Sequence, residues 1–273
     1  MSENEIVKDE AAPPSTASAT PTLSADLRAA ANPDLSEDLA LAFLKRADLP
    51  PEVIEQLAKN ASALRSRKVK IALASHPHTP RHVSVPLARQ FYTFDLMKVA
   101  LSPTVPADVR VAVEDVLISR LKTVTIGERL TLARRASGRV AAALLLDVEA
   151  GDGRTIHAKI TDAKTVARGT RVMQTALENP RLTEVLVIDS VLHASASAAL
   201  VQAVARHEKW SSRKEIRAAL LRTEHLSLAR ALEFSREIPA RLLQDVLATS
   251  RLPAKIKDQL FRESKTGSLP PSC

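Results

Sequence analysis

Between Arg171 and Phe261 the sequence repeats one helical pattern three times. Each repeat has two short stretches whose apolar residues lie three or four positions apart, the spacing of one helix face. Turns at Pro180, near Lys209 and near Glu237 separate the repeats at intervals of roughly 28 residues, a period typical of helical repeats. A single hairpin of this kind cannot bury its apolar face, whereas stacked hairpins can. The sequence therefore predicts an all-α fold, an α-solenoid of stacked helical hairpins.

The preceding part of the chain contains the same kind of turn twice. His76–Pro80 and Ser102–Pro106 each hold two prolines, and the two turns lie about 26 residues apart. In each turn the first proline ends one helix and the second begins the next. The helical repeat is thus expected to begin well before residue 171.

Several residues are expected to mark helix starts. Ser36 and Thr183 are predicted to be N-caps, because their hydroxyls can accept a hydrogen bond from the first turn. Thr125–Glu128 and Ser212–Glu215 match the capping-box pattern, in which a hydroxyl and a carboxylate each satisfy one backbone N–H. Pro239 is expected at a first helical position, where its missing N–H has no consequence.

The sequence divides into three parts. Residues 1–33 form an acidic tail rich in Pro, Ser and Thr, which we expect to be disordered because it has little apolar surface to bury. Residues 34–263 form the predicted helical repeat domain. Residues 264–273 have no periodicity and are expected to be a disordered C-terminal tail. Ala150–Gly153 is the one flexible joint expected inside the domain, and residues 154–170 are expected to add an irregular helix.

The charge is unevenly distributed along the chain. The formal net charge is +8, but residues 1–34 contain six acids and two bases, a local charge of −4. The remainder therefore carries about +12. A basic body favours nucleic acid, an anionic membrane surface or an acidic protein face as partner. An arginine-rich surface that only interacts with solvent explains the same balance.

The sequence also indicates in which cellular compartment the protein is expected. The only cysteine is Cys273, so a disulfide or a cysteine-based metal site within one chain is excluded. The polar, acidic N-terminus is not a secretory signal. The longest weakly charged run, Val185–Ala205, contains Asp189, His193 and Gln202, which are costly in hydrocarbon. We expect a cytoplasmic protein without a membrane span.

Four phrases resemble the HEAT-like and leucine-rich-repeat-variant α-solenoids of bacteria: ALASHPHTP, TIGERLTLARRASGRVAAALLLD, ALENPRLTE and ARHEKWSSRKEIRAALL. They look similar to a group of bacterial repeat proteins of uncharacterised function. The resemblance covers roughly Leu35 to Glu263 and implies a HEAT-like superhelix. The variant family also carries a cysteine-ligated iron–sulfur region, which this chain cannot form. HEAT-like DNA glycosylases place several aromatic residues at DNA, whereas this chain has only Trp210 and Tyr92 beside its phenylalanines.

Three patterns in the sequence resemble chemical sites. His76, His78 and His82 have spacings that could converge on a metal, but no cysteine or carboxylate nearby completes the ligand set. A polar turn in which a histidine caps a helix end is the preferred interpretation. The S-x-x-K of residues 211–214 lacks its partner motifs. The acidic cluster of Asp147, Glu149 and Asp152 lacks a matching base. We therefore expect no catalytic, cofactor-binding or metal-binding residues.

The segment around Trp210 is the predicted partner-binding region. Trp210 either packs across a helix start, which we prefer, or serves as an exposed anchor for a partner. The cations around it would form a basic ridge if stacked repeats align them. The residues predicted to bind a partner are Arg206, Trp210, Arg213, Lys214 and Arg217. The ridge would continue through Arg222, Arg230, Arg236 and Arg241.

The sequence thus favours a non-enzymatic scaffold that binds a macromolecule through the solenoid surface, most readily another protein. Nucleic-acid binding through the basic ridge is the alternative. A DNA-glycosylase-type enzyme is the third hypothesis, and it would need a carboxylate beside aromatic residues. No small-molecule substrate is indicated.

Overall fold

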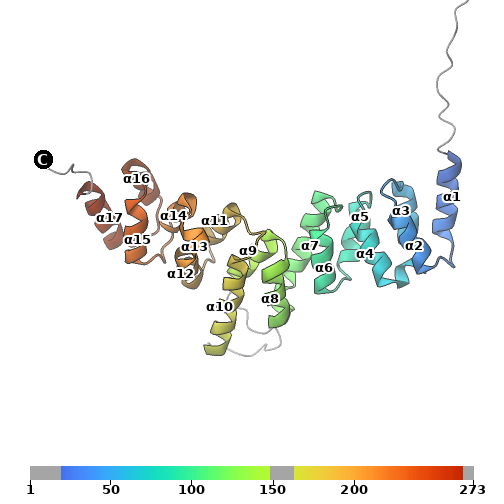
Figure 1. The fold of residues 1–273 in the computed structure, drawn as a ribbon, viewed down its shortest axis with the longest axis horizontal. Helices are drawn as coiled ribbons and strands as arrows, with labels where there is room; N and C mark the ends of the chain where they lie inside the picture. Colours follow the sequence, from blue (N-terminus) through green and yellow to red (C-terminus); the bar gives the residue numbers. More distant parts are fainter. Residues whose placement is uncertain (1–19, 148–162, 267–273) are drawn as a thin grey trace, which may run out of the picture. The chain divides into compact units, whose positions relative to one another are not determined.

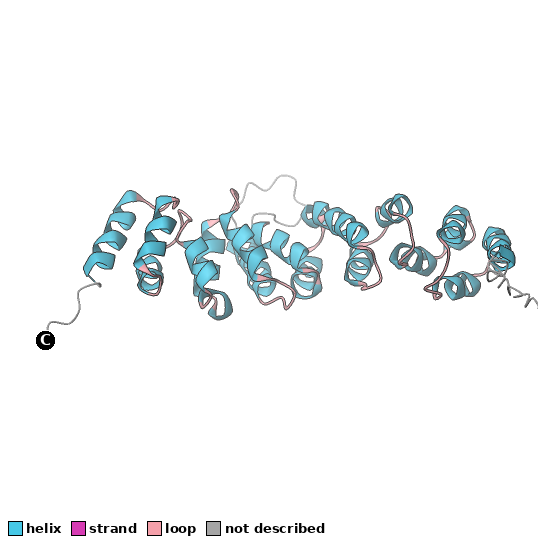
Figure 2. Ribbon diagram, turned by 90° about the horizontal axis from the view of Figure 1, so that it is seen from above, coloured by secondary structure: helices cyan, strands magenta, loops and turns pink. Residues whose placement is uncertain are grey.

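The structure is a computed structural model that describes residues 20–147 and 163–266. Over these residues every regular element is helical and no strand is present (Figure 2). The described residues form 17 α-helices, α1 to α17, and two short 3₁₀ helices, η2 and η3. None of these helices combines the length and the apolar character needed to cross a bilayer. The all-α prediction is confirmed.

The chain divides into two compact units. Unit 1 comprises residues up to Leu87 together with Thr104–Pro106, and unit 2 comprises Ala88–Pro103 and the chain from Ala107 onward. The helices of unit 1 are α1 (Thr20–Ala31), α2 (Glu37–Leu44), α3 (Pro51–Lys59), η2 (Ala63–Arg65), α4 (Arg67–Ser75) and α5 (Arg81–Ala88). Helix α1 packs on α3, and α2 packs on α4. In both of these pairs a helix contacts the helix two places along the chain, as stacked hairpins do (Figure 1).

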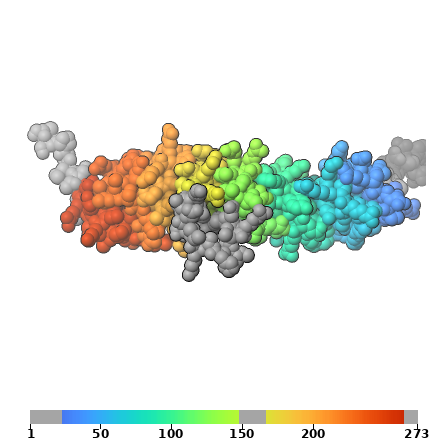
Figure 3. Space-filling model, turned by 90° about the horizontal axis from the view of Figure 1, so that it is seen from below, coloured from blue at the N-terminus to red at the C-terminus, as the bar shows by residue number. Residues whose placement is uncertain are grey.

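Unit 2, taken by itself, contains the same kind of helix packing. Its helices are α6 (Thr93–Leu101), α7 (Ala107–Ser119), η3 (Leu121–Thr123), α8 (Ile126–Arg135), α9 (Gly138–Leu146), α10 (Ala163–Leu177), α11 (Glu184–Leu192), α12 (Ala198–Arg206), α13 (Glu208–Ser211), α14 (Lys214–Leu220), α15 (Leu228–Arg236), α16 (Ala240–Ala248) and α17 (Ala254–Thr266). Helix α8 packs on α10, α9 on α11, α10 on α12, and α15 on α17. The surface colours of this unit follow chain order in Figure 3. Helices packed in series confirm the predicted solenoid-like fold.

The core consists mainly of Leu, Val and Ala side chains. Trp210 and Phe234 are the largest fully buried side chains among the described residues. Each fully buried Leu or Val contributes about 1.5–3 kcal/mol relative to an exposed one. Small residues at helix contacts allow close approach. A Cβ on Gly138 would overlap the backbone carbonyl oxygen of Arg181, so glycine is required where α9 meets the loop before α11.

Two of the predicted caps form as expected. The Ser36 hydroxyl accepts a hydrogen bond from the N–H of Leu39 at the start of α2. At the start of α8, the Thr125 hydroxyl accepts from the Glu128 N–H, and the Glu128 carboxylate accepts from the Thr125 N–H. Both caps depend only on residues within one helical turn.

The other predicted helix starts need correction. The capping box at Ser212–Glu215 is wrong, because the short helix α13 occupies this turn and Ser212 ends it by donating to the Lys209 carbonyl. Helix α14 begins at Lys214 with no side-chain cap. Thr183 does precede α11, but its hydroxyl makes no cap bond. Pro239 is the N-cap of α16 and lies one residue before the predicted position.

The helical part begins earlier than predicted. Helix α1 lies inside the segment of residues 1–33 that was expected to be disordered. It packs on α3, and its Ala30 is fully buried. Residues 1–19, 148–162 and 267–273 lie outside the described residues, and so do most of both predicted tails and the joint at Ala150–Gly153. Helix α10 begins at Ala163 and passes through Gly169 without a break.

Candidate functional site

Successive repeats are joined by hydrogen bonds from polar side chains at helix ends. Asn60, at the end of α3, donates through Nδ2 to the carbonyls of Ala30 and Asn32, at 2.9 and 2.7 Å. Its Oδ1 accepts from the N–H of Ser62 at 2.9 Å. The side chain thus fixes its own turn and binds the turn about 30 residues earlier. We call such contacts inter-repeat hydrogen bonds.

The same arrangement recurs after α10. Asn179 is 1% exposed, and its Nδ2 donates to the carbonyls of Ala133 at 2.8 Å and Ala136 at 3.2 Å. Its Oδ1 accepts from the N–H of Arg181 at 2.8 Å. The separations along the chain are 46 and 43 residues, longer than the 30 and 28 residues that the Asn60 bonds span. As with Asn60, the bonds join the end of one helix to the end of an earlier one.

A serine makes this bond after α16. The Ser250 hydroxyl donates to the Leu221 carbonyl at 2.6 Å, which lies 29 residues earlier. The same oxygen accepts from the N–H of Leu252 at 3.0 Å. A buried carbonyl at the end of one helix is thus satisfied by a side chain at the end of a later one, which avoids an unpaired polar group.

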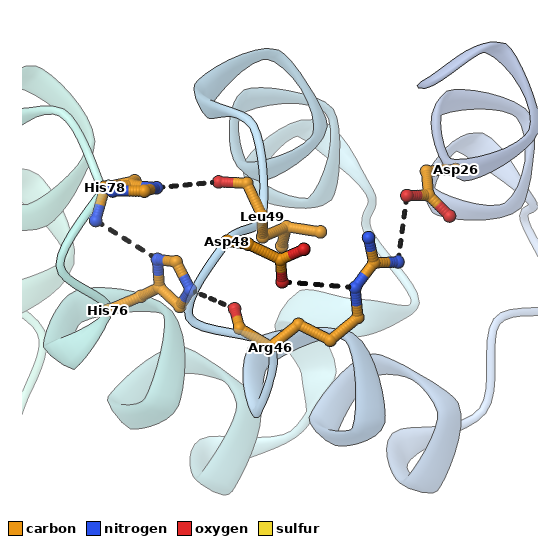
Figure 4. Close-up of polar contacts among 6 residues, drawn as sticks. All are labelled: Asp26, Arg46, Asp48, Leu49, His76 and His78. Atoms are coloured by element: carbon orange, nitrogen blue, oxygen red, sulfur yellow. Dashed lines mark hydrogen bonds and ion pairs between the residues drawn. The ribbon is translucent and has the colours of Figure 1, made fainter. Parts of the chain in front are cut away.

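In unit 1, two histidines make inter-repeat hydrogen bonds (Figure 4). His76 is buried, and its Nε2 lies 2.8 Å from the Arg46 carbonyl, so this nitrogen carries the proton and donates. Its Nδ1 accepts from the N–H of His78 at 3.2 Å. The ring of His78 in turn places Nδ1 3.0 Å from the Leu49 carbonyl. The side chain of Arg46 extends away from the histidines and pairs with Asp26 at 2.9 Å.

The three histidines therefore do not converge on a metal. His76 and His78 direct ring nitrogens at backbone carbonyls, and His82 is 70% exposed with its Nε2 3.5 Å from Glu55. Within the part of the chain that the structure describes, no three metal-ligating side chains gather. The interpretation of a polar turn in which histidine caps a helix end is confirmed, because His76 is the C-cap residue of α4 and its ring binds the Arg46 carbonyl, two residues after α2.

Asp147, from the predicted acidic cluster, pairs with Arg129 at 3.2 Å. Arg129 is 4% exposed and also donates to the Leu121 carbonyl at 2.7 Å. Burial raises the pKa of Asp147, although the charges of Arg129 and Lys122 oppose this. The other members of the cluster, Glu149 and Asp152, lie outside the described residues. This arrangement joins α8 to the end of α9.

Trp210 packs in the interior. It is 1% exposed, and its Nε1–H donates to the Leu177 carbonyl at the end of α10, at 2.8 Å. The ammonium of Lys209 lies 4.0 Å from the ring centroid. The preferred interpretation of Trp210 as a packing residue is confirmed, and its alternative role as an exposed anchor is wrong. Its indole replaces the asparagine or serine that makes the inter-repeat bond elsewhere.

Half of the eight cations in the predicted basic ridge are paired with carboxylates. Arg213 lies 2.7 Å from Glu184. Further ion pairs join Arg217 to Glu237, Arg230 to Glu233 at 2.7 Å and Arg236 to Glu263 at 3.4 Å. Arg206 and Lys214 are exposed, and neither has a hydrogen-bond or ion-pair partner among the described residues. The ridge is therefore partly neutralised by carboxylates of its own and neighbouring repeats.

A cleft of about 470 Å³ lies between α10 and α12 in unit 2. Met173 and Leu177 from α10 and Ala203 from α12 give it an apolar floor. Polar side chains on its rim are Thr170, Gln174, Glu178, Gln202, Arg206 and His207. The cleft brings Arg206, one of the predicted partner-binding residues, to the helix pair next to Trp210. We take this cleft as the candidate functional site.

The rim of the cleft carries opposite charges on its two walls. Glu178, after α10, and Arg206, at the end of α12, are exposed, and neither is paired among residues 20–147 and 163–266. His207, the C-cap residue of α12, follows Arg206 and also lines the cleft. Burial lowers the pKa of His207, and the Lys209 charge adds to this effect while Glu178 and Glu208 oppose it.

Sequence reasoning missed the cleft, although a signal is present. Thr170, Gln174 and Glu178 lie four residues apart and follow one face of α10, beside the predicted apolar face. Gln202 and Arg206 have the same spacing on α12. A pattern of this kind does not indicate which other helix lies opposite.

Comparison with models of protein families, with curated proteins and with solved structures found no match to the chain.

Proposed function

We propose that this protein is a non-enzymatic scaffold that binds another protein, and that the cleft between α10 and α12 receives a segment of that partner. The observation that supports this proposal is the cleft itself, with an apolar floor and unpaired charges on opposite walls. Stacked helical repeats commonly use such surfaces to bind macromolecules. The resemblance to bacterial HEAT-like solenoids agrees with this role.

The lining of the cleft defines the kind of segment that fits. A groove between two helices can take the apolar face of an amphipathic helix, read as anchor residues at i, i+3, i+4 and i+7. Ala199 and Ala203 on α12 present the accessible apolar surface that these anchors would contact, above Met173 and Leu177, which are each 1% exposed. A cation on the segment would face Glu178 and a carboxylate would face Arg206, which fixes the direction in which the segment binds.

Nucleic acid is the alternative partner. The ion pairs between cations of the basic ridge and carboxylates argue against it. Arg213, Arg217, Arg230 and Arg236 already donate to carboxylates. A phosphate backbone would have to displace these carboxylates to gain the same bonds. Binding by the remaining cations would weaken steeply as salt is raised, with a slope that counts the phosphates neutralised.

A glycosylase-type reaction needs a carboxylate beside aromatic side chains that hold an extruded base. The cleft lining contains one carboxylate, Glu178, and no phenylalanine, tyrosine or tryptophan. Tyr92 is 70% exposed at the start of α6, whereas Trp210 is buried. These placements favour a binding role for the cleft.

The test is affinity capture from a lysate of the source organism with matched variants. Ala203→Glu places a carboxylate on the apolar floor of the cleft, and the half-buried position leaves room for the new side chain to reach solvent. Ala229→Glu makes the same change on α15 at an exposed site away from the cleft. Far-UV circular dichroism checks that both variants are folded.

We expect proteins that are captured by the wild type and by Ala229→Glu and lost with Ala203→Glu. Nuclease treatment of the lysate should leave this set unchanged. Capture that is the same for all three chains contradicts the assignment to the cleft. Loss of the captured proteins after nuclease treatment, together with a steep salt dependence, would favour the nucleic-acid alternative.

A further inference from the structure

His207 is the single residue that links α12 to α13. Its N–H donates to the Val204 carbonyl at 3.2 Å, and its own carbonyl accepts from the N–H groups of Trp210 and Ser211 at 3.1 and 2.8 Å. It is thus the C-cap of one helix and the N-cap of the next. The placement of α13, and with it that of Trp210, depends on this residue.

The imidazole of His207 lacks the bonds that hold His76. In His76 the Nδ1 atom accepts from the N–H two residues later, and Nε2 donates to a carbonyl of the preceding repeat. The Nδ1 atom of His207 is buried and has no hydrogen-bond partner among the described residues. The indole of Trp210 donates instead to Leu177, 30 residues before His207.

This geometry favours the neutral ring. An unpaired acceptor nitrogen is a modest cost, whereas a protonated ring would place a charged N–H donor in the same site without an acceptor. The charged groups facing the ring are Glu178 after α10, Arg206 on α12, and Glu208 and Lys209 on α13. The guanidinium of Arg213, before α14, lies 5.7 Å from the Trp210 ring. Neither glutamate forms a hydrogen bond or an ion pair with His207 in the described structure.

We infer that His207 is a pH-sensitive switch: protonation expels its ring from the junction of α12 and α13 and loosens the packing of Trp210. The two rings are neighbours, with their centroids 6.4 Å apart, so we expect departure of the imidazole to give solvent access to the indole. Because Trp210 bonds to the end of α10 and His207 lines the cleft, the opening would also change the cleft. The inference concerns the fold alone and does not depend on the identity of a partner.

The sign of the effect follows from the pKa. The pKa of His207 is lowered from its ordinary value of 6.5, so below that value the unfolded chain binds more protons than the folded one. Stability from this group is therefore complete at higher pH and is lost as the pH falls from 6.5 through the folded pKa. Local opening of the junction is favoured over the same window.

Trp210 is the only tryptophan, so its fluorescence reports this junction directly. The experiment measures acrylamide quenching of the full chain from about pH 7.5 to about pH 5, with far-UV circular dichroism to follow the helices. We expect a red-shifted emission and a several-fold larger quenching constant at low pH while the helical signal is largely kept. His207→Gln should abolish this change. His193→Gln should retain it, because His193 is an exposed residue at the end of α11 whose Nδ1 already accepts a hydrogen bond from Ser195.

Hydrogen exchange in the wild type provides a second measurement should His207→Gln fail to fold. Corrected for the intrinsic pH dependence, the Trp210 and Ser211 amides should lose protection at low pH, while the α9 amides should keep it. The inference is overturned by a quenching constant that stays constant over this range or by the same rise in His207→Gln. It is also overturned by dimmer emission without greater quencher access, which would mean that the ring is protonated in place.

Discussion

Replacing Asn179 with alanine removes one complete set of inter-repeat hydrogen bonds. The side chain is 1% exposed and makes three bonds, two as donor to the carbonyls of Ala133 and Ala136 and one as acceptor from Arg181. A net hydrogen bond contributes about 0.5–1.5 kcal/mol, and a buried group left unpaired costs about 1–3 kcal/mol. We therefore expect Asn179→Ala to lower the free energy of unfolding of unit 2 by about 2–4 kcal/mol.

Urea denaturation followed by Trp210 fluorescence measures this loss, because Trp210 and Asn179 both lie in unit 2. With a denaturant slope of about 2 kcal/mol per molar, the midpoint should fall by roughly 1–2 M. Ser119→Ala is the matched control in the same unit: Ser119 is exposed, and its hydroxyl makes one hydrogen bond, to the Val116 carbonyl. It should change stability by no more than about 0.5 kcal/mol. A shift for Asn179→Ala as small as that of Ser119→Ala would refute the reasoning.

Three further predictions concern other parts of unit 2. Gly138→Ala should lower the thermal midpoint, since the added methyl overlaps a carbonyl oxygen of the loop before α11 and overpacking costs about 1–3 kcal/mol, whereas Gly127→Ala has open space and should be neutral or slightly stabilising. Glu128→Gln should destabilise α8 at neutral pH; the backbone N–H of the capping box lowers the pKa of Glu128, so the difference in urea midpoint from wild type should shrink as the pH falls below about 4.5. Arg129→Met should cost about 1–3 kcal/mol in urea denaturation because it leaves the half-buried Asp147 carboxylate and the Leu121 carbonyl without this partner. Asp147→Asn should also destabilise unit 2, because it removes the carboxylate that faces the Arg129 guanidinium, a side chain only 4% exposed.

Features set by a few neighbouring residues could be predicted from the sequence. The capping box of Thr125 and Glu128 forms as expected because both partners lie within one turn. The same pattern at Ser212 does not form a box, because the short helix α13 occupies this turn and Ser212 is its C-cap, with a hydroxyl that donates to the Lys209 carbonyl. Helix α1 was missed because its stability comes from α3 rather than from its own composition.

The contacts between repeats could not be predicted, because they depend on register. Asn60 and Asn179 were recognisable as residues near helix ends, but the carbonyls they bind lie 28 to 46 positions earlier in the chain. The basic ridge shows the same limit. Glu184 lies 29 residues before Arg213, and Glu263 lies 27 residues after Arg236, so charge counting along the chain cannot reveal their pairing.

The labelling rate of a single cysteine thiol tests the claim that a partner segment occupies the cleft between α10 and α12. Cys273 is replaced by serine, and one cysteine is introduced at position 203 in the cleft or at position 229 on α15. The rate of maleimide labelling is then compared with and without the protein that the wild type captures. The account predicts slower labelling at position 203 and unchanged labelling at position 229. Equal labelling of position 203 in both conditions would contradict it.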